Sequence, residues 1–241
     1  MKYAILSDIH GNLEALESVL AELRKHKVEK YIFLGDVVGY GANPNECLEL
    51  LQSLNPLAVL GNHDAAVCGL TDLGNFTALA YQAIVWTRQE LEPAGREYLA
   101  SLPLVRTFGE ITIFHSNLVI PDDWRYIQKP QESYSSFANL SGRFAFFGHS
   151  HRPVIYRKDG QWIDYLLETE TVLSREWQYM INVGSVGQPR DRDSRASFGI
   201  FDDESGELQI IRVKYPIRKA QKKIRAAGLP KRLATRLAEG K

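Results

Sequence analysis

YAILSDIHGNLEALESVLAEL, residues 3–23, joins a short apolar run, a polar tip and an amphipathic stretch. The apolar run at 3–6 is too short for a helix and predicts a buried β-strand. Leucines recur at helical spacing over 13–23, and Asn12 precedes them as an N-cap. We therefore predict a strand and a helix joined by the polar residues 7–11.

The same alternation continues along the chain. Apolar runs at 31–35 and 57–61 predict two more strands. Residues 42–54 predict a helix, with Pro44 just inside its start. This β-α-β-α-β order predicts an α/β fold with a central sheet, largely parallel in this half, and helices on its faces.

The rest of the chain predicts helices, further strands and two hairpins. We expect two helices within 76–101, divided at Glu92-Pro93, and strands at 111–115 and 144–149 with a helix at 131–140 between them. Two hairpins follow, one turning at Asp159-Gly160 and the other at 204–206. The chain ends in two short basic helices separated by 228–230.

Charge is distributed unevenly although the formal net charge is +0. Residues 212–241 carry 11 Lys and Arg residues and one acidic residue, whereas residues 1–211 carry 18 basic and 28 acidic residues. The basic segment has few aromatic residues and no recognisable base-reading module, so nucleic acid is not the favoured partner. We expect the segment to dock on the acidic body or to form a solvated face.

The two cysteines, Cys47 and Cys68, form neither a disulfide framework nor a cysteine zinc site, which favours a reducing compartment. Ser7 and Asp8 interrupt the apolar N-terminal residues before they resemble a signal peptide. No stretch approaches 18 consecutive apolar residues. We expect a cytoplasmic protein without a membrane span.

Polar side chains follow five of the predicted strands. Five of the six histidines lie at these tips, and the sixth, His26, lies at the end of a helix. Ligands of an open α/β sheet bind beyond the carboxyl ends of its strands, so we expect the tips to converge. Residues i and i+2 of an extended segment also point to the same side. The tips contribute Asp8, His10, Asp36, Asn62, His63, Asp64, His115, His149 and His151.

Divalent cations explain why carboxylates and imidazoles gather in one crevice, since unpaired buried carboxylates are costly. Mixed nitrogen and oxygen ligands suit Mn, Fe, Zn, Co or Ni better than Ca or Mg. The candidates outnumber the ligands of one tetrahedral metal, so two metals sharing a carboxylate fit better. Taken singly, each motif has an ordinary alternative: a turn at Gly35-Asp36, a helix start capped by Asn62, or a hydrogen-bonded structural histidine at His115.

These motifs, Asp8-x-His10, Gly35-Asp36, 61–64, His115 and 148–151, resemble the calcineurin-like metallophosphoesterase superfamily. Residues 35–46, 182–202 and 226–240 are similar to a bacterial and archaeal phosphodiesterase-like subgroup. The resemblance implies a four-layer α/β/β/α sandwich with two facing mixed sheets. It also implies that residues 1–241 form one domain, with a basic helical C-terminal segment at about 214–241.

The resemblance also implies roles for individual residues. His63 would act at the scissile phosphate as a general acid or transition-state stabiliser, and Asp64 would orient it. The family usually has glycine after the fourth-strand histidine, whereas Ser116-Asn117-Leu118 follow here, which changes the neighbouring loop. One metal would be held by Asp8, His10 and His151, the other by Asn62, His115 and His149, and Asp36 would bridge them.

The predicted function is a dinuclear metal-dependent hydrolase of phosphomonoesters or phosphodiesters, with metal-activated hydroxide attacking and His63 assisting the leaving oxygen. We expect manganese, with iron, zinc, nickel or cobalt as alternatives. The predicted substrates are small nucleotides, dinucleoside polyphosphates or aryl phosphodiesters. Two rival functions are a non-catalytic metal-binding scaffold of the same fold and a redox or dioxygen metal enzyme.

Asn12, Tyr40 and Arg190 are the predicted substrate-binding residues. Arg190 follows the turn 184–189, whose backbone N–H groups are predicted to cradle an anion. The alternative for Arg190 is a surface salt bridge with Asp191 or Asp193, which the sequence favours equally. The sequence makes no prediction of the oligomeric state.

Overall fold

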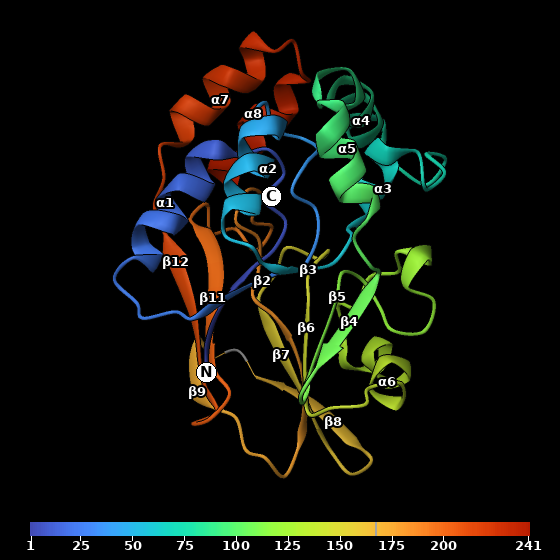
Figure 1. Ribbon diagram of the computed structural model, residues 1–241, viewed down its shortest axis with the longest axis vertical. Helices are drawn as coiled ribbons and strands as arrows, with labels where there is room; N and C mark the ends of the chain where they lie inside the picture. The colour runs from blue at the N-terminus through green and yellow to red at the C-terminus, as the bar shows by residue number, and fades with distance from the viewer. Residues whose placement is uncertain (167) are drawn as a thin grey trace.

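Two mixed β-sheets form the centre of the computed structural model, which describes residues 1–166 and 168–241 (Figure 1). Each sheet has six strands within this described part of the chain. The first sheet contains, in spatial order, β3 (Leu57–Ala58), β2 (Lys30–Phe33), β1 (Lys2–Leu6), β11 (Ala196–Asp202), β12 (Glu207–Val213) and β9 (Glu170–Val172). The second contains β4 (Val105–Phe108), β5 (Ile111–Phe114), β6 (Phe144–Phe147), β10 (Gln178–Asn182), β7 (Val154–Asp159) and β8 (Trp162–Leu166).

Parallel pairing in part of each sheet brings several strand ends to the same side of that sheet. In the first sheet β1 pairs in parallel with β2, and β2 with β3. In the second sheet β5 pairs in parallel with β6, and β6 with β10. Antiparallel strands complete both sheets, beginning with β11 beside β1 and β7 beside β10.

The strands that carry the polar tips are divided between the two sheets, so the expectation of one central sheet is wrong. β1, β2 and β3 lie in the first sheet, whereas β5 and β6 lie in the second. Every residue of β5 and of β6 is buried. A strand buried on both faces is compatible with one sheet between helices and with two facing sheets, so the apolar pattern does not distinguish them. The two-sheet fold implied by the family resemblance is confirmed.

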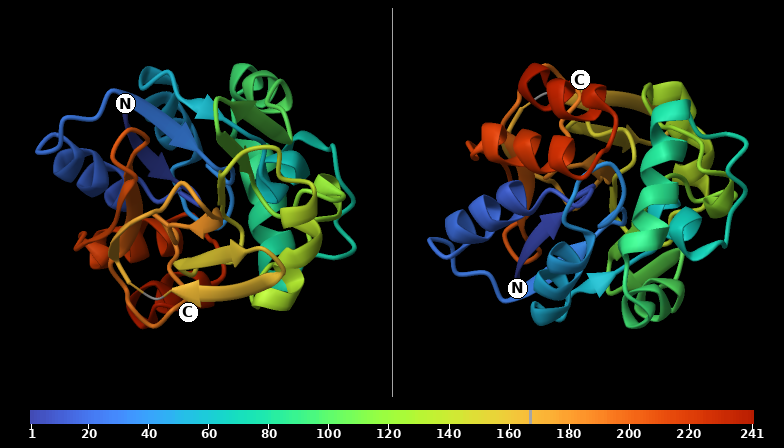
Figure 2. Two further views of the ribbon diagram at one scale, coloured as in Figure 1. Left: turned by 90° about the horizontal axis from the view of Figure 1, so that it is seen from below. Right: turned by 90° about the horizontal axis from the view of Figure 1, so that it is seen from above.

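Helices cover the outer faces of the sheets and complete four layers (Figure 2). One apolar cluster joins most of them to the outer face of the first sheet, and a second joins α6 (Pro130–Ala138) to the second sheet. A third cluster, which contains Ile5, Ile181 and Phe201, fills the space between the sheets. The helices in the first cluster are α1 (Leu13–Leu23), α2 (Pro44–Ser53), α3 (Asn62–Cys68), α4 (Ala78–Glu90), α5 (Pro93–Ala100), α7 (Ile217–Ala226) and α8 (Lys231–Glu239).

Most predicted element boundaries agree with the structure. The predicted division at Glu92-Pro93 separates α4 from α5, and 228–230 separates α7 from α8. The first hairpin turns one residue later than predicted, because Asp159 pairs with Trp162 and leaves residues 160–161 as the loop. None of the helices in the described part of the chain has the length and apolar character needed to cross a bilayer.

The basic C-terminal segment docks on the body, as one of the two sequence alternatives predicts. α7 lies beside α1 and α8 beside α7 (Figure 2). The carboxylate of Glu14 in α1 is buried and lies 2.7 Å from Nζ of Lys223 and 3.3 Å from Nζ of Lys219. A buried carboxylate needs such partners, so these ion pairs tie the segment to the first helix.

We predict that Phe201→Ala will destabilise the protein by about 3–5 kcal/mol, because it empties a site between the sheets. The Phe201 ring is buried, with its centroid 4.9 Å from that of Phe144 and 5.3 Å from that of Phe146. Urea unfolding measures the change. Trp162→Ala is the matched control, because Trp162 is 83% exposed, and it should cost less than about 0.5 kcal/mol. Equal costs for the two variants would contradict the assigned layer.

Candidate metal centre and catalytic site

The structure brings the predicted metal ligands together in one buried region. They follow β1, β2, β5 and β6, or begin α3 directly after β3. Their ligand atoms form three overlapping groups, and within each group the atoms lie within 4.8 Å of one another. The groups are Asp8, His10 and His151; His10, Asp36 and His63; and Asp36, His115 and His149.

Backbone strain is concentrated at these strand ends. A positive φ is costly for a residue other than glycine, by about 1–2 kcal/mol, and such strain persists only where the surroundings enforce it. Asp8 and His10 join one group, as their i, i+2 spacing predicts, whereas His149 and His151 join different groups. The strained residues are Asp8 (φ 52°), His10 (50°), Asp36 (64°), His149 (66°) and His151 (58°).

In the first group two imidazole nitrogens face each other. Nδ1 of His10 lies 3.0 Å from the carbonyl of Val38, and Nδ1 of His151 lies 2.6 Å from that of Gln188. A carbonyl only accepts, so each Nδ1 donates its proton and each neutral ring keeps a lone pair on Nε2. These two Nε2 atoms are 3.1 Å apart, and that of His151 lies 3.3 Å from Oδ1 of Asp8. The arrangement places two imidazole nitrogens and one carboxylate oxygen, all hydrogen-bond acceptors, close to one another.

The group that contains His115 and His149 repeats this pattern. Nδ1 of His115 donates to the carbonyl of Leu34 at 2.7 Å, and Nε2 of His149 donates to that of Trp124 at 2.8 Å. The remaining nitrogens lie 3.1 Å and 2.9 Å from Oδ1 of Asn62. Metal-binding histidines characteristically donate their other ring N–H to such acceptors, which fixes the tautomer that binds metal.

Asp36 lies between the two groups. Its Oδ2 is 3.3 Å from Nε2 of His115 and 3.6 Å from Nε2 of His10. Its Oδ1 accepts a hydrogen bond from the backbone N–H of His63 at 2.8 Å, whereas Oδ2 accepts none from the described residues. A buried carboxylate oxygen without a donor is costly. The carboxylate and imidazole groups around Asp36 could therefore hold divalent metal ions.

The pKa shifts of Asp36 and His115 reflect the same excess of hydrogen-bond acceptors over donors in this region. Burial opposes ionisation of Asp36, but the neighbouring histidines, His115 above all, hold the pKa of its carboxyl below the usual range. Burial likewise opposes a charge on His115, but the Asp36 carboxylate outweighs it and raises the pKa of that ring to about 9. Without a metal ion, the Asp36 carboxylate thus favours protonation of the His115 ring at the nitrogen that would otherwise bind metal.

His63 lies beside this cluster on the wall of a cleft. Its ring centroid is 4.4 Å from that of Tyr40 and 5.3 Å from that of Phe76. Its Nδ1 has no hydrogen-bond partner among the described residues. Burial lowers the pKa of the ring to about 4, with the Asp36 carboxylate opposing the shift. The ring is therefore neutral at pH 7, with a free nitrogen.

Asp64 occupies a different position from the one expected for a residue that orients His63. Its carboxylate accepts hydrogen bonds from the backbone N–H groups of Asp36 at 2.7 Å, Val38 at 3.2 Å and Gly61 at 3.3 Å. It therefore fastens the loop after β2 to the start of α3. Any effect on His63 passes through these loops, because the Asp64 side chain makes no hydrogen bond to the imidazole in the described structure.

Arg190 is not engaged in the predicted surface salt bridge. Asp191 pairs with Arg212, and Asp193 pairs with Arg195. The guanidinium of Arg190 instead donates from Nε and Nη2 to Oε1 of Gln188. It lies over the ring of Tyr40, with 5.7 Å between Cζ and the ring centroid.

The predicted anion cradle in the turn 184–189 is wrong. The backbone N–H of Val186 donates to the carbonyl of Ser7, and that of Gly187 donates to the carbonyl of Asp8. These hydrogen bonds use the donors to fasten the turn to the end of β1. They are consequently not available to a ligand.

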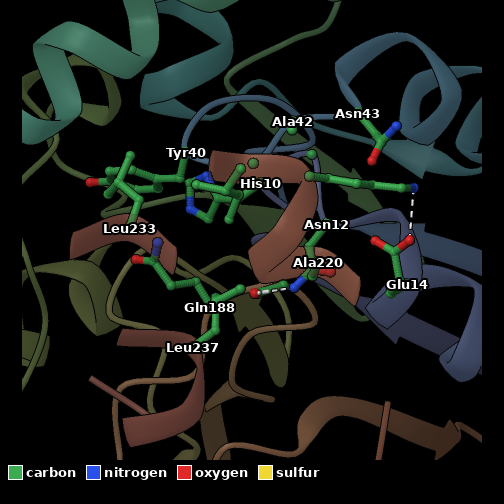
Figure 3. Close-up of a pocket in the computed structure, with 15 residues that line it drawn as sticks. His10, Asn12, Glu14, Tyr40, Ala42, Asn43, Gln188, Ala220, Leu233 and Leu237 are labelled. Carbon is green, nitrogen blue, oxygen red and sulfur yellow. Dashed lines mark hydrogen bonds and ion pairs between the residues drawn. The ribbon is translucent and has the colours of Figure 1, made fainter. Parts of the chain in front are cut away.

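Asn12 also makes its polar contacts within the chain (Figure 3). Its Oδ1 accepts from the backbone N–H of Ala15, which confirms the predicted N-cap, and its Nδ2 donates to the carbonyl of Gly187 at 2.7 Å. The side chain is buried. Asn12 thus positions the loop next to His10.

The cleft beside the candidate metal ligands has a volume of about 730 Å³, and its walls combine aromatic and polar side chains. Tyr126 stacks on His149, with ring centroids 4.0 Å apart. The sequence analysis missed the loop that carries Trp124 and Tyr126. Asn117 could have pointed to this loop, since it lies in the segment that departs from the family pattern. Its side-chain oxygen accepts hydrogen bonds from two backbone N–H groups and so shapes the loop. The aromatic residues that line the cleft are Tyr40, Phe76, Trp124 and Tyr126.

A family model for the calcineurin-like phosphoesterase superfamily domain matches residues 1–206. The chain belongs to this superfamily. It is 41% identical, over 242 residues, to an uncharacterized protein of Methanocaldococcus jannaschii, which covers 99% of this chain and 98% of that protein. A metallophosphoesterase structure from Sphaerobacter thermophilus matches the full length of both chains with 38% identity and a TM-score of 0.88.

A more distant match concerns half of the chain. The symmetrical bis(5′-nucleosyl)-tetraphosphatase of Coxiella burnetii is 29% identical over 126 residues, which cover 50% of this chain and 42% of that protein. Membership of a metallophosphoesterase superfamily implies divalent metal ions, and the His and Asp groups described above could hold them.

We predict that Mn²⁺ will raise the melting temperature of the protein and that Asp36→Asn will abolish most of this rise. Metal at 100 times its Kd would stabilise the folded state by about 2.7 kcal/mol. Asp36→Asn keeps the shape of the side chain but removes the charge shared by the two ligand groups. Calorimetry and elemental analysis measure the stabilisation and the bound metal. Asp164→Asn, a change in an exposed carboxylate of β8, is the control. Equal metal content in Asp36→Asn and Asp164→Asn would contradict the bridging role.

Proposed function

We propose that the protein is a dinuclear metal-dependent phosphoesterase acting on small phosphorylated substrates. The observation that carries the proposal is the set of four buried imidazoles that donate to backbone carbonyls and direct their other nitrogen toward acceptor oxygens or another imidazole. Together with the unpartnered Oδ2 of Asp36, these nitrogens form a ligand set for two cations. Superfamily membership supports phosphate esters as the substrates.

The two proposed metals have distinct ligands. When bound, such cations neutralise phosphoryl charge and lower the pKa of water. The mixed imidazole and oxygen set suits manganese, with iron, zinc, nickel or cobalt as alternatives. The assignment is Asp8, His10 and His151 for one metal, Asn62, His115 and His149 for the other, and Asp36 for both.

His63 is proposed to protonate the leaving oxygen of the ester. It is buried on the wall of the cleft, and the Nδ1 atom of its ring is unpartnered among the described residues. The anionic phosphate of a bound ester would raise the low pKa of the ring, because an adjacent negative charge favours imidazolium. Protonated His63 would then donate its proton as the ester bond breaks.

A small nucleotide or a dinucleoside polyphosphate fits the cleft better than a nucleic acid. Its volume of about 730 Å³ lies in the range of small-ligand sites. The aromatic side chains offer stacking surfaces for a base, and the acidic residues of the lining would repel an extended polyanion. The tetraphosphatase relative supports this substrate class. The acidic lining consists of Asp72, Asp122, Asp123 and Glu132.

Substrate contacts are proposed for Tyr40 and Arg190, whereas Asn12 keeps its role as a helix cap. Tyr40 lines the cleft, and Arg190 lies over its ring without a carboxylate partner among the described residues. Both rival functions remain distinguishable by assay. A scaffold would bind metal without turnover, and a redox enzyme would consume an oxidant instead of releasing phenol from a phosphate ester.

We predict that His63→Ala will lower kcat for bis-p-nitrophenyl phosphate or p-nitrophenyl phosphate by about 10²–10⁴-fold while the metal content stays unchanged. The loss follows from removal of the proton donor without removal of a metal ligand. Release of p-nitrophenol with added Mn²⁺ measures turnover, and elemental analysis measures the metal. His26→Ala, at a partly exposed histidine after α1, is the control. Full turnover by metal-loaded His63→Ala would contradict the assigned role.

A further inference from the structure

Tyr126 is the most exposed of the aromatic residues that line the cleft. It is 46% exposed, whereas Tyr40 is buried and both Phe76 and Trp124 are half-buried. Its ring stacks on that of His149, with the centroids 4.0 Å apart and the planes inclined by 20°. Because one face of the tyrosine ring is packed on the imidazole, its exposed area belongs to the other face and the edges. Tyr126 therefore presents an aromatic face to the cleft.

The other three aromatic rings of the cleft are engaged within the chain. The ring of Tyr40 lies 4.4 Å from that of His63, and the ring of Phe76 meets the same imidazole edge-on at 5.3 Å. The indole N–H of Trp124 donates to the hydroxyl of Thr71 at 3.2 Å, which joins two loops that line the cleft. Among the described residues of the lining, the fourth ring is consequently the best placed to stack on a ligand.

The loop that carries Tyr126 is held in place on both sides of the ring. The side chain of Asn117 accepts from two backbone N–H groups at 3.0 Å and donates to the carboxylate of Asp123 at 2.8 Å. The carbonyl of Trp124 accepts from Nε2 of His149 at 2.8 Å. The stack on His149 and these hydrogen bonds fix the ring before any ligand arrives. A ligand that stacks on it therefore loses little affinity to ordering of the side chain.

A flat aromatic ring is the chemical group that fits this face. Stacking of a nucleobase on an aromatic side chain strengthens binding by about 5–150-fold and depends little on which base is bound. A sugar without a base has no π-face to stack. Since Tyr126 lies directly on the candidate metal ligand His149, a base on its outer face would lie next to the proposed metal centre. The phosphate attached to the same nucleoside would then be close to the metals.

We propose that Tyr126 is the platform on which the nucleobase of the substrate stacks, and that it determines specificity for nucleotides over sugar phosphates of equal charge. The proposal rests on the proposed function and narrows its substrate class from small phosphate esters to nucleotides. Tyr126 acts on the bound base and takes no part in the proton transfer assigned to His63. The alternative role of Tyr126 is only to cover His149, which would affect all phosphate ligands alike.

Calorimetry with two ligands that differ only in the base tests the platform. The ligands are the non-hydrolysable phosphonate analogues of adenosine 5′-monophosphate and of ribose 5-phosphate, and the protein is loaded with Mn²⁺. The wild type should bind the adenosine compound about tenfold or more tightly than the ribose compound. Tyr126→Ala should remove most of this preference, and Tyr126→Phe should keep it because the ring remains. Tyr134→Ala in α6 is the matched control, since Tyr134 is 47% exposed and is not among the described residues that line the cleft.

The ribose compound separates stacking from a merely structural role. In Tyr126→Ala its Kd should stay within about twofold of the wild-type value, while the Kd of the adenosine compound rises. Circular dichroism checks that each variant is folded, and elemental analysis measures its metal. A wild type without preference for the adenosine compound would overturn the platform, as would an equal loss of affinity for both compounds in Tyr126→Ala. Wild-type protein that prefers the adenosine compound through Tyr126 yet hydrolyses no phosphate ester would instead overturn the proposed function.

Discussion

The packing of hydrogen-bond acceptors around Asp36 is the constraint on which the rest of the structure depends. Imidazole nitrogens lie 3.3–3.9 Å from the carboxylate oxygens of Asp8 and Asp36, and among these rings only that of His115 has a raised pKa. Such a cluster is unfavourable in a buried place unless positive charge occupies it. The backbone carbonyls that accept the other ring protons keep the rings in this state, so the second layer of the site is as important as the first.

The strand ends and their glycines enforce this geometry. A Cβ at Gly61 would lie 2.1 Å from Oδ1 of Asp36, and a Cβ at Gly148 would lie 2.1 Å from Oγ of Ser7. Neither position therefore admits a side chain. Several ligands adopt left-handed backbone conformations at the same place, which sheet pairing behind them and helix packing around them maintain. The stability of the two-sheet core thus sustains a strained, electron-rich site.

The C-terminal segment packs against this core next to the candidate site. Its lysines compensate the buried carboxylate of Glu14, which fixes α7 against α1. Its apolar residues place α8 next to the cavity that contains His10 and Tyr40. A segment that reads as a basic tail in the sequence therefore lines the cavity next to His10, and its residues Arg212, Lys219 and Lys223 pair with carboxylates of the rest of the chain.

The sequence by itself determined the candidate ligand set. Asp8, His10, Asp36 and the other tip residues directly follow short apolar runs. Such a pattern can be recognised in the sequence because the strand, the turn and the candidate ligand are contiguous. The helical boundaries at Pro93 and Pro230 are local for the same reason, since proline removes a backbone donor at a fixed position.

Only the tertiary structure decided how the distant parts meet. The division of the strands between two sheets depends on which buried faces pack together, and an apolar run carries no information about its partner. The partners of Asp64, the backbone donors of the turn 184–189 and the placement of Arg236 over Tyr40 involve contacts between segments far apart in sequence. Such contacts are set by packing geometry, which residue spacing along one chain does not encode.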